Sequence, residues 1–444
     1  MIITNGKIIT WTEPNQILEG FDLLIRAGKI SSIQKSGQLQ TAFPQEEILD
    51  AEGKWVMPGN ICAHTHFYGA YSRGMAIPGP APRDFSEILA SLWWKLDKAL
   101  DEEGVYYSAL TLLIDAIKYG TTTLFDHHAS PNVIDGSLDI IYKALHESGL
   151  RASLCYEVTD RDGKEKAKAG MRENSRFIRR AAGGKLDALV RAHFGLHASL
   201  TVSDETLEAA VNENNGQAGF HAHAAEGLID ETDALQKYGK RVIKRFADRG
   251  ILGPRTILAH GVHLDETEMD LLKASGTWLS HQPRSNQNNA VGVTPVPEML
   301  ARGVKVCLGN DGFSNAMWDE WFSSYLIQKD HAHNPGVMTG DQIVKMAITH
   351  NSELATTTFD GLQIGKIVPD AAADLIFVDY QPITPLSAGN LPWHILFGFR
   401  SGMVTMTMVA GKILMQNRKL LFLDEAAIAA KSREVAARTW AKIN

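Results

Sequence analysis

The chain has 444 residues, of which 44% are hydrophobic and 21% charged, and its net charge is −7. This length allows a large buried core and more than one domain, and the composition is ordinary for a globular enzyme. The acidic balance, without any run of Lys and Arg, argues against a nucleic-acid partner. The N-terminus lacks a signal pattern, and no apolar stretch approaches the roughly 18 residues of a membrane span, so we expect a cytoplasmic protein with no membrane contact.

Short strand-like segments separated by turns fill residues 1–54 and return after residue 360. Near the N-terminus, Asn5-Gly6 and Ala27-Gly28 punctuate the apolar runs and favour tight turns. Near the C-terminus, similar runs extend from Ala373 to Leu423. Neither segment has enough strands to form a stable sheet alone. We therefore expect residues 1–54 and 361–423 to form one composite β-sandwich.

The region between these segments, residues 55–360, alternates apolar runs with longer amphipathic stretches. This alternation predicts parallel βα units, and eight such units fit an α/β fold with a closed (β/α)8 TIM-like barrel. An open doubly wound sheet fits the same pattern, but no GxGxxG or GxxxxGK(S/T) motif follows a strand. The expected strands are Trp55–Ala63, Thr121–Phe125, Arg151–Val158, Leu189–Leu196, Gly219–Ala222, Thr256–Ala259, Thr277–Ser280 and Val304–Leu308. Residues 424–444 are expected to form a C-terminal helix that packs on the barrel in preference to a second subunit.

Two histidines follow the first expected barrel strand at a spacing that suits a metal site. His64 and His66 flank Thr65 at the end of the apolar run. Residues i and i+2 of an extended chain point to the same side, so both imidazoles can reach one ion. A hydrolytic metal centre needs three or four such ligands and an open position for water. We therefore interpret this pair as the first part of a metal centre.

A second pair, His221 and His223, closes the fifth expected strand. Spacing alone allows either histidine to be the ligand. We favour His223 because it leaves Glu226, three residues later, beside the ion. A hydrolase that moves protons needs a carboxylate next to the attacking water. The sequence thus predicts a ligand and an acid–base group at one strand end.

Three further candidates follow expected strands. His260 can ligate the ion or hydrogen-bond the attacking water, and Asp311 can both touch the ion and accept a proton. His197 ends the fourth strand and is expected to contact the substrate. Because no lysine occupies that strand end, we expect one metal ion and not a lysine-bridged pair.

The motifs occur in a fixed order along almost the whole chain. They are His64-Thr65-His66, His223-Ala224-Ala225-Glu226, His260, His281-Gln282-Pro283-Arg284-Ser285-Asn286 and Asn310-Asp311-Gly312. This set resembles the amidohydrolase superfamily, and more narrowly its branch of guanine deaminase, methylthioadenosine/adenosylhomocysteine deaminases and triazine hydrolases. Residues 125–132, 154–163 and 288–292 make the chain most similar to the aminohydrolase SsnA group within that branch. The chain departs from the family pattern at Gln282, where Asn is usual, and at Asn310, where Thr is usual; neither change removes a ligand.

The resemblance implies one divalent metal ion, usually zinc and sometimes iron, held by His64, His66, His223 and Asp311. His260 would orient the attacking water, and Glu226 would protonate a ring nitrogen of the substrate. Asp311 would pass the proton of the water to the departing amine. His197 and Glu87 match positions that contact substrate in the deaminases. A homodimer or a larger homo-oligomer is a further expectation from the family.

Taken together, these features predict a metal-dependent hydrolytic deaminase that removes an exocyclic amine from an N-heterocycle such as a purine or pterin. Two alternatives keep the same site: hydrolysis of a cyclic amide C–N bond, and dechlorination of a triazine. A more remote alternative is a metal-binding scaffold without activity. Zinc deaminases with H-x-E and P-C-x-x-C motifs are excluded, because the chain has no such cysteine pair.

Overall fold

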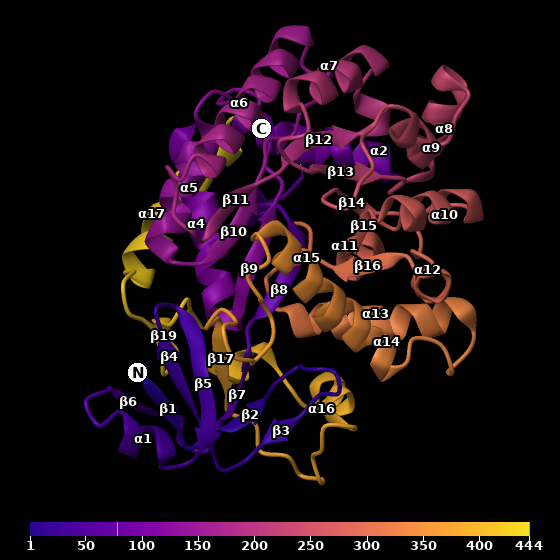
Figure 1. Ribbon diagram of the computed structural model, residues 1–444. Helices are drawn as coiled ribbons and strands as arrows, with labels where there is room; N and C mark the ends of the chain where they lie inside the picture. Colours follow the sequence, from indigo (N-terminus) through magenta and orange to yellow (C-terminus); the bar gives the residue numbers. More distant parts are fainter. Residues whose placement is uncertain (78, 444) are drawn as a thin grey trace.

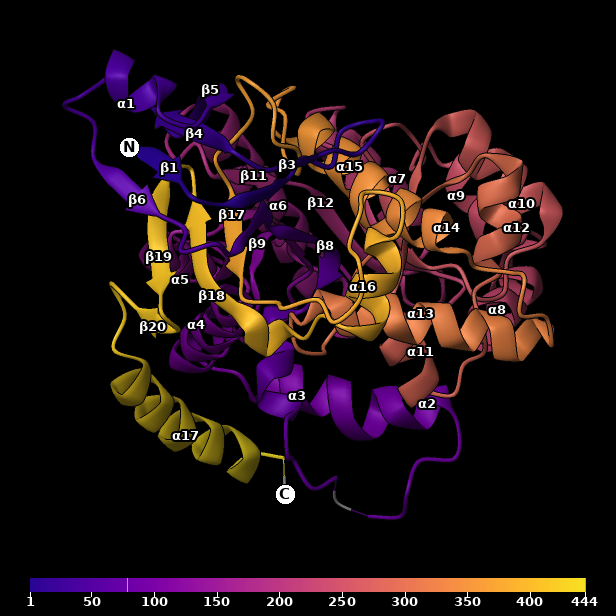
Figure 2. The ribbon, with the colours of Figure 1, turned by 90° about the horizontal axis from the view of Figure 1, so that it is seen from below.

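The computed structural model describes residues 1–77 and 79–443, and Figures 1 and 2 show it from two sides. Pro78, in the expected barrel region, and Asn444, at the end of the expected C-terminal helix, lie outside the described residues. Strands from both ends of the chain lie together at the bottom of Figure 1. The middle of the chain forms parallel strands with helices around them.

Two sheets combine the N- and C-terminal segments. One runs in the order β5-β4-β1-β6 and the other in the order β20-β19-β18-β17-β7-β2-β3. Because β17 pairs antiparallel with β7, and β7 pairs parallel with β2, the two ends of the chain share one sheet. The strands are β1 (Ile2–Thr4), β2 (Lys7–Ile9), β3 (Ile17–Leu18), β4 (Phe21–Arg26), β5 (Lys29–Lys35), β6 (Ile48–Asp50), β7 (Trp55–Pro58), β17 (Leu375–Val378), β18 (Val404–Val409), β19 (Lys412–Gln416) and β20 (Lys419–Leu420).

A common apolar core joins these two sheets. Ile3 and Leu23 of the first sheet pack in one buried cluster with Val56, Leu375 and Met408 of the second. Full burial of one such side chain is worth about 1.5–3 kcal/mol. Each terminal segment therefore depends on the other for its stability.

The expected strand Trp55–Ala63 is divided in the structure. Its first part is β7, in the shared sheet, and the barrel strand β8 begins only at Asn60 and runs to Thr65. The chain changes sheet at Gly59, where a side-chain Cβ would lie 2.2 Å from Thr122, so only glycine allows the close passage. The sequence hides this division because both parts are buried and apolar.

The parallel strands form two sheets that meet at both edges. Their orders are β11-β10-β9-β8 and β12-β13-β14-β15-β16. At one edge, β11 and β12 follow each other along the chain and only His193 separates them. Isolated parallel bridges, Val158↔Leu196 and Thr65↔Asp311, also connect the two sheets. The strands are β8, β9 (Thr121–Asp126), β10 (Arg151–Leu154), β11 (Val190–Ala192), β12 (Phe194–Ala198), β13 (Phe220–Ala224), β14 (Ile257–His260), β15 (Trp278–His281) and β16 (Lys305–Leu308).

Helices surround these strands, and their ends are marked in the sequence. The N-cap Asp101 accepts a hydrogen bond from the Gly104 amide at the start of α4, which ends at Gly120 with φ 75°. The other helices are α1 (Gln38–Ala42), η1 (Phe67–Ser72), α5 (Ser137–Ser148), α6 (Lys164–Ala182), η3 (Ser199–Thr201), α7 (Asp204–Asn214), α8 (Leu228–Tyr238), α9 (Val242–Asp248), α10 (Glu266–Ser275), α11 (Pro283–Asn288), α12 (Val296–Arg302), α13 (Met317–Ala332), α14 (Gly340–Val344), η4 (Lys345–His350), α15 (Asn351–Thr358), α16 (Leu391–Phe397) and η5 (Ser401–Met403), with α4 at Glu102–Tyr119. None of the described helices is both long and apolar enough to cross a bilayer.

Two helical segments lie side by side at the lower edge of Figure 2. One is an almost continuous run of α2 (Phe85–Ile88), η2 (Leu89–Trp93) and α3 (Trp94–Ala99). The other is α17 (Glu425–Ala441), which packs within the same chain: Trp440 Nε1 donates to the carbonyl oxygen of Tyr71 at 2.8 Å. The first of these segments lines the site described next.

Candidate active site

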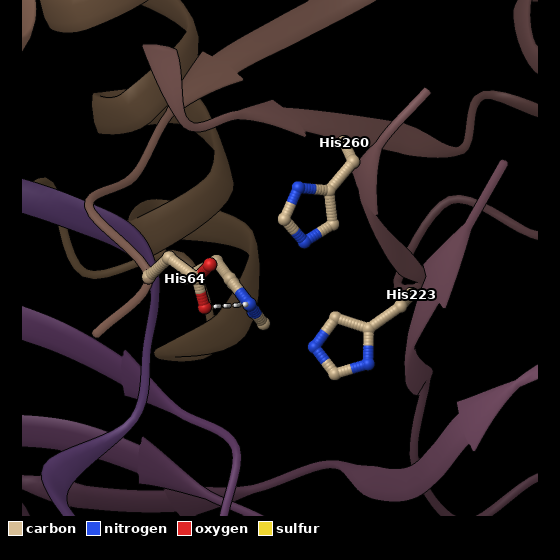
Figure 3. A group of neighbouring side chains, drawn as sticks. His64, His223 and His260 are labelled. Carbon is tan, nitrogen blue, oxygen red and sulfur yellow. Dashed lines mark ion pairs between the residues drawn. The ribbon is translucent and has the colours of Figure 1, made fainter. Parts of the chain in front are cut away.

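The carboxyl ends of the parallel strands bring histidines and one aspartate together. His64 lies in β8, His223 in β13 and His260 at the end of β14, and Asp311 follows β16. Their nearest side-chain nitrogen and oxygen atoms lie within 4.8 Å of one another, and all four residues are buried. Figure 3 shows the three imidazoles turned toward one another. The structure thus gathers these residues, expected from the sequence, at one point.

His66 completes this cluster, which we call the ligand group. Its Nε2 lies 2.9 Å from Asp311 Oδ1 and 3.2 Å from His223 Nε2. His64 Nε2 lies 3.6 Å from the same carboxylate oxygen. His260 and Asp311 have φ angles of 78° and 58°, a conformation that costs a non-glycine residue about 1–3 kcal/mol. Such strain is concentrated at functional sites.

Hydrogen bonds behind the ligand group fix which ring nitrogens face its centre. His66 Nδ1 donates to the carbonyl oxygen of His127, and His223 Nδ1 donates to that of His197 at 3.0 Å. In the neutral imidazoles, the two Nε2 atoms therefore carry the lone pairs and face each other at 3.2 Å across the centre of the group. Inward imidazole nitrogens with one carboxylate are the ligands that a divalent ion such as zinc takes.

His221, the alternative ligand left open by its spacing, lies behind His64. Its Nε2 is 2.8 Å from His64 Nδ1. The Nε2 atoms of His64 and His260 are buried and, among the described residues, have no hydrogen-bond partner. A buried polar atom without a partner costs about 1–3 kcal/mol, which an ion or its water ligand would remove. The chemistry of this donor set therefore fits a metal.

Glu226 lies beside His260, and its ionisation differs from that of Asp311. Its Oε2 is 3.4 Å from His260 Nε2, and Asn289 Nδ2 donates to Oε1 at 3.3 Å. Burial, followed by the charge of Asp311, raises the pKa of Glu226 well above its ordinary value. Burial alone would raise the pKa of Asp311 too, but the His64 and His66 imidazoles beside its carboxylate hold it well below its ordinary value. Glu226 therefore keeps its proton to a higher pH than Asp311 does, a difference that suits acid–base work.

A cavity lies over the ligand group. Its apolar wall comes from the helical segment α2–η2–α3 and consists of Phe85, Leu89, Trp93 and Trp94. Its polar wall includes Asp97, Glu157 and His197. An aromatic wall that faces polar groups suits a small aromatic ligand with hydrogen-bonding atoms.

Glu87, expected from the resemblance to contact substrate, does not line this cavity. Phe85 and Leu89 are four residues apart and face the cavity together, so Glu87, between them, points to the other side of the helix. There its carboxylate binds Arg83 and lines a separate surface depression. Its position therefore gives no support to the expected contact, whereas His197 does lie on the cavity wall.

Glu157 and Asp97, for which the sequence predicted no role, also line the cavity. Glu157 follows β10, and a carboxylate just past a barrel strand is a signal that could have identified it. Asp97 lies on α3 and pairs with Arg161 at 2.5 Å. Burial raises the pKa of Asp97 to about 7. No local sequence pattern distinguishes Asp97 from an aspartate on the exposed face of a helix.

A family model for the amidohydrolase family matches residues 55–414. The chain belongs to the amidohydrolase family. This membership confirms the family expected from the motifs at the strand ends.

Known proteins similar to this amidohydrolase include deaminases. It is 30% identical to a 5′-deoxyadenosine deaminase of Methanosarcina acetivorans, over 100% of this chain and 99% of that one. It is also 30% identical to a 5-methylthioadenosine/S-adenosylhomocysteine deaminase of Syntrophomonas wolfei, over 100% of both chains. A crystal structure of an adenosine deaminase from Xanthomonas campestris with bound zinc has a TM-score of 0.84 at 22% identity, and covers 99% of this chain and 98% of that one. The amidohydrolase shares the fold of that enzyme, which confirms the expected α/β fold class.

Proposed function

We propose that this amidohydrolase is a metal-dependent hydrolytic deaminase that removes an exocyclic amine from an N-heterocycle such as a purine or pterin. The observation that carries the proposal is the position of Glu226, a buried carboxyl group that lines the same cavity as the ligand group, 3.4 Å from His260 Nε2. An acid placed there can serve a ring nitrogen of a bound heterocycle. The two relatives are both named as deaminases, which supports the same reaction class.

The proposal includes one divalent ion, zinc or alternatively iron, held by His64, His66, His223 and Asp311. An ion of this kind lowers the pKa of water from 15.7 to about 7 and so makes hydroxide available at neutral pH. His260 would orient the attacking water. Its Nδ1 lies 2.9 Å from Asn286 Oδ1, and this bond leaves Nε2 free toward the cavity.

Two carboxyl groups would share the proton transfers. Glu226 gives a proton to the ring nitrogen next to the reacting carbon, and Asn289 holds its Oε1 in place. Asp311 accepts the proton of the attacking water and returns it to the departing amine, which leaves as ammonia. Ser285 donates to Asp311 Oδ2 and keeps that carboxylate oriented.

The test is ammonia release by purified, zinc-loaded protein from a panel of aminopurines, aminopterins and aminotriazines. We expect release from one class of ring. Two results would favour the alternative reactions at the same site. They are ring opening of a cyclic amide, and chloride release from a chlorotriazine, each without release of ammonia. A protein with one metal per chain that is inert across the panel would favour a scaffold.

We also propose a homodimer or larger homo-oligomer. Four apolar side chains on α13 and α16 are 39–55% exposed: Phe322, Leu326, Trp393 and Phe397. Contiguous apolar surface of this kind is often an interface. Light scattering coupled to size-exclusion chromatography measures the mass; a monomer at micromolar concentration would contradict this part of the proposal.

A further inference from the structure

Glu157 and His197 form a polar end of the cavity. The side-chain atoms that they present there have no hydrogen-bond donor among the described residues. Glu157 Oε1 lies 3.7 Å from His197 Nε2, and Oε2 lies 3.4 Å from His127 Nδ1. Both distances exceed the 2.7–3.2 Å of an N–H···O bond. Glu157 is 4% exposed and His197 7%, and both line the cavity. A buried carboxylate thus meets the cavity without a donor from the described residues.

The neighbouring imidazole nitrogen of His197 is an acceptor as well. Thr201 Oγ1 donates to the carbonyl oxygen of Ala198, so it accepts from His197 Nδ1, which is 2.5 Å away. His197 Nε2 therefore carries a lone pair. Two acceptors lie side by side, and neither satisfies the other. This end of the cavity is complementary to a ligand that donates hydrogen bonds.

The charge around the cavity is acidic. Among the described lining residues there is no lysine or arginine, and five carry carboxyl groups: Asp97, Glu157, Glu226, Asp230 and Asp311. Arg161, behind Asp97, already has two carboxylate partners, since Asp97 lies at 2.5 Å and Asp162 at 3.3 Å. Away from the ligand group, an anionic group on a ligand would therefore meet no lysine or arginine among the described lining residues, which is costly in a buried site.

We propose that Glu157 and His197 determine specificity by selecting an N-heterocycle that has a ring N–H on the edge away from the departing amine and no anionic group. This inference rests on the proposed deaminase function and names its substrate class. The aromatic wall holds the ring, and the ring N–H donates to the two acceptors. A sugar or methyl group on that nitrogen removes the donor; 5′-deoxyadenosine, in the name of one relative, has a sugar there.

The first experiment compares matched compounds on the unaltered, zinc-loaded protein. The pairs are adenine with 9-methyladenine, and guanine with 9-methylguanine; adenosine and adenosine 5′-monophosphate test the sugar and the anion. In the pair that reacts, we expect kcat/KM to be about 10- to 100-fold higher for the compound with the N–H, the range of a hydrogen bond to a charged group. We expect the monophosphate to be the poorest substrate. Equal kcat/KM within a pair would overturn the inference.

The second experiment compares two variants of the cavity wall. Glu157→Gln should reduce the preference for the N–H compound to within about threefold, mainly through KM, because Gln retains one acceptor but loses the charge. Asp97→Asn makes the same carboxyl-to-amide change in the same cavity, but the partner of Asp97 is Arg161, so the preference should remain. An equal loss in both variants would assign the preference to overall charge and would contradict a direct contact with Glu157.

A binding measurement separates this inference from the proposed function. Calorimetry with purine and 9-methylpurine, which lack the exocyclic amine, needs no turnover. Tighter binding of purine by the unaltered protein, lost in Glu157→Gln at unchanged metal content and melting temperature, supports the role of Glu157. If no ammonia is released from any compound, the proposed function fails while this binding test still stands. If ammonia is released without any preference, only the inference about Glu157 and His197 fails.

Discussion

The ligand group and the wall of the cavity above it are built in different ways. The ligands lie at the ends of β8, β13, β14 and β16, where each strand is hydrogen-bonded to its neighbours. The apolar wall comes from α2, η2 and α3, a single segment outside the sheets. Backbone ladders thus fix the ligand group, while side-chain packing and ion pairs such as that of Asp97 with Arg161 hold the wall. We infer that the residues at the strand ends determine the reaction, and that the segment α2–η2–α3 determines which substrate binds.

Register shows how closely the sheet fixes the ligands. In the pairing of β13 with β14, His223 lies opposite Ala259 and Ala224 lies opposite His260. A slip by one residue would turn each side chain to the other face of its strand. Ala259, and not His260, therefore shares the face of His223, and the positive φ of His260 turns its imidazole to the position that Asp311 and His64 share.

The largest effect is expected from His223→Ala, compared with His221→Ala on the same strand. His223 Nε2 faces the ligand group, so its loss should abolish metal retention after dialysis, and with it ammonia release. His221 supports His64 from behind, and loss of such a partner typically costs about 10- to 100-fold in metal affinity or activity. Metal content by mass spectrometry and ammonia release are measured on both variants. Equal metal loss, or the reverse order, would contradict the assignment of the inward histidine.

Glu226→Gln should give the next largest effect. The variant keeps the side-chain shape and the ligand group, but Gln cannot give a proton to the substrate. We expect bound metal to be unchanged and kcat to fall by about 10²- to 10⁴-fold, the span of acid–base contributions. Glu231→Gln is the control, since Glu231 is a buried glutamate that does not line the cavity. Near-normal turnover in Glu226→Gln would remove Glu226 from the mechanism.

The same contrast explains what the sequence predicts. His64, His66, His223, His260 and Asp311 are residue types that bind metals and lie at expected strand ends, and two local rules place them together: strand periodicity and the shared carboxyl edge of parallel strands. The wall lacks such rules. Trp93 could equally have packed in the core, and the distance along the chain gives no sign that Asp97 reaches Arg161. The position of Glu157 after β10 could have identified it as a candidate site residue. Its neighbours His127 and His197 follow other strands, so only the fold shows that the three lie together.

A change in the wall should alter binding more than chemistry. The Trp93 ring lies 6.2 Å from the Tyr68 ring, centroid to centroid. A Cβ atom added to Gly312 would lie 2.9 Å from the Trp93 indole, so Trp93 is next to the loop that carries Asp311. Trp93→Leu removes aromatic contact worth about 0.5–1.5 kcal/mol beyond its area. We expect KM to rise about 3- to 10-fold with kcat within twofold. Phe422→Leu, at an exposed aromatic residue outside the cavity, is the control. A fall in kcat with KM unchanged would show that the wall also positions the reacting groups.

The smallest effect is expected from Glu87→Gln, which tests where the wall ends. Family resemblance places Glu87 at a substrate position, but the helix turns its carboxylate toward Arg83 and away from Phe85 and Leu89. Kinetics of Glu87→Gln on the preferred substrate should therefore match the unaltered protein within twofold in both kcat and KM. A rise in KM of tenfold or more would mean that the segment α2–η2–α3 rotates when substrate binds. In that case the wall would be an adaptable surface, and the contrast with the fixed ligand group would become stronger.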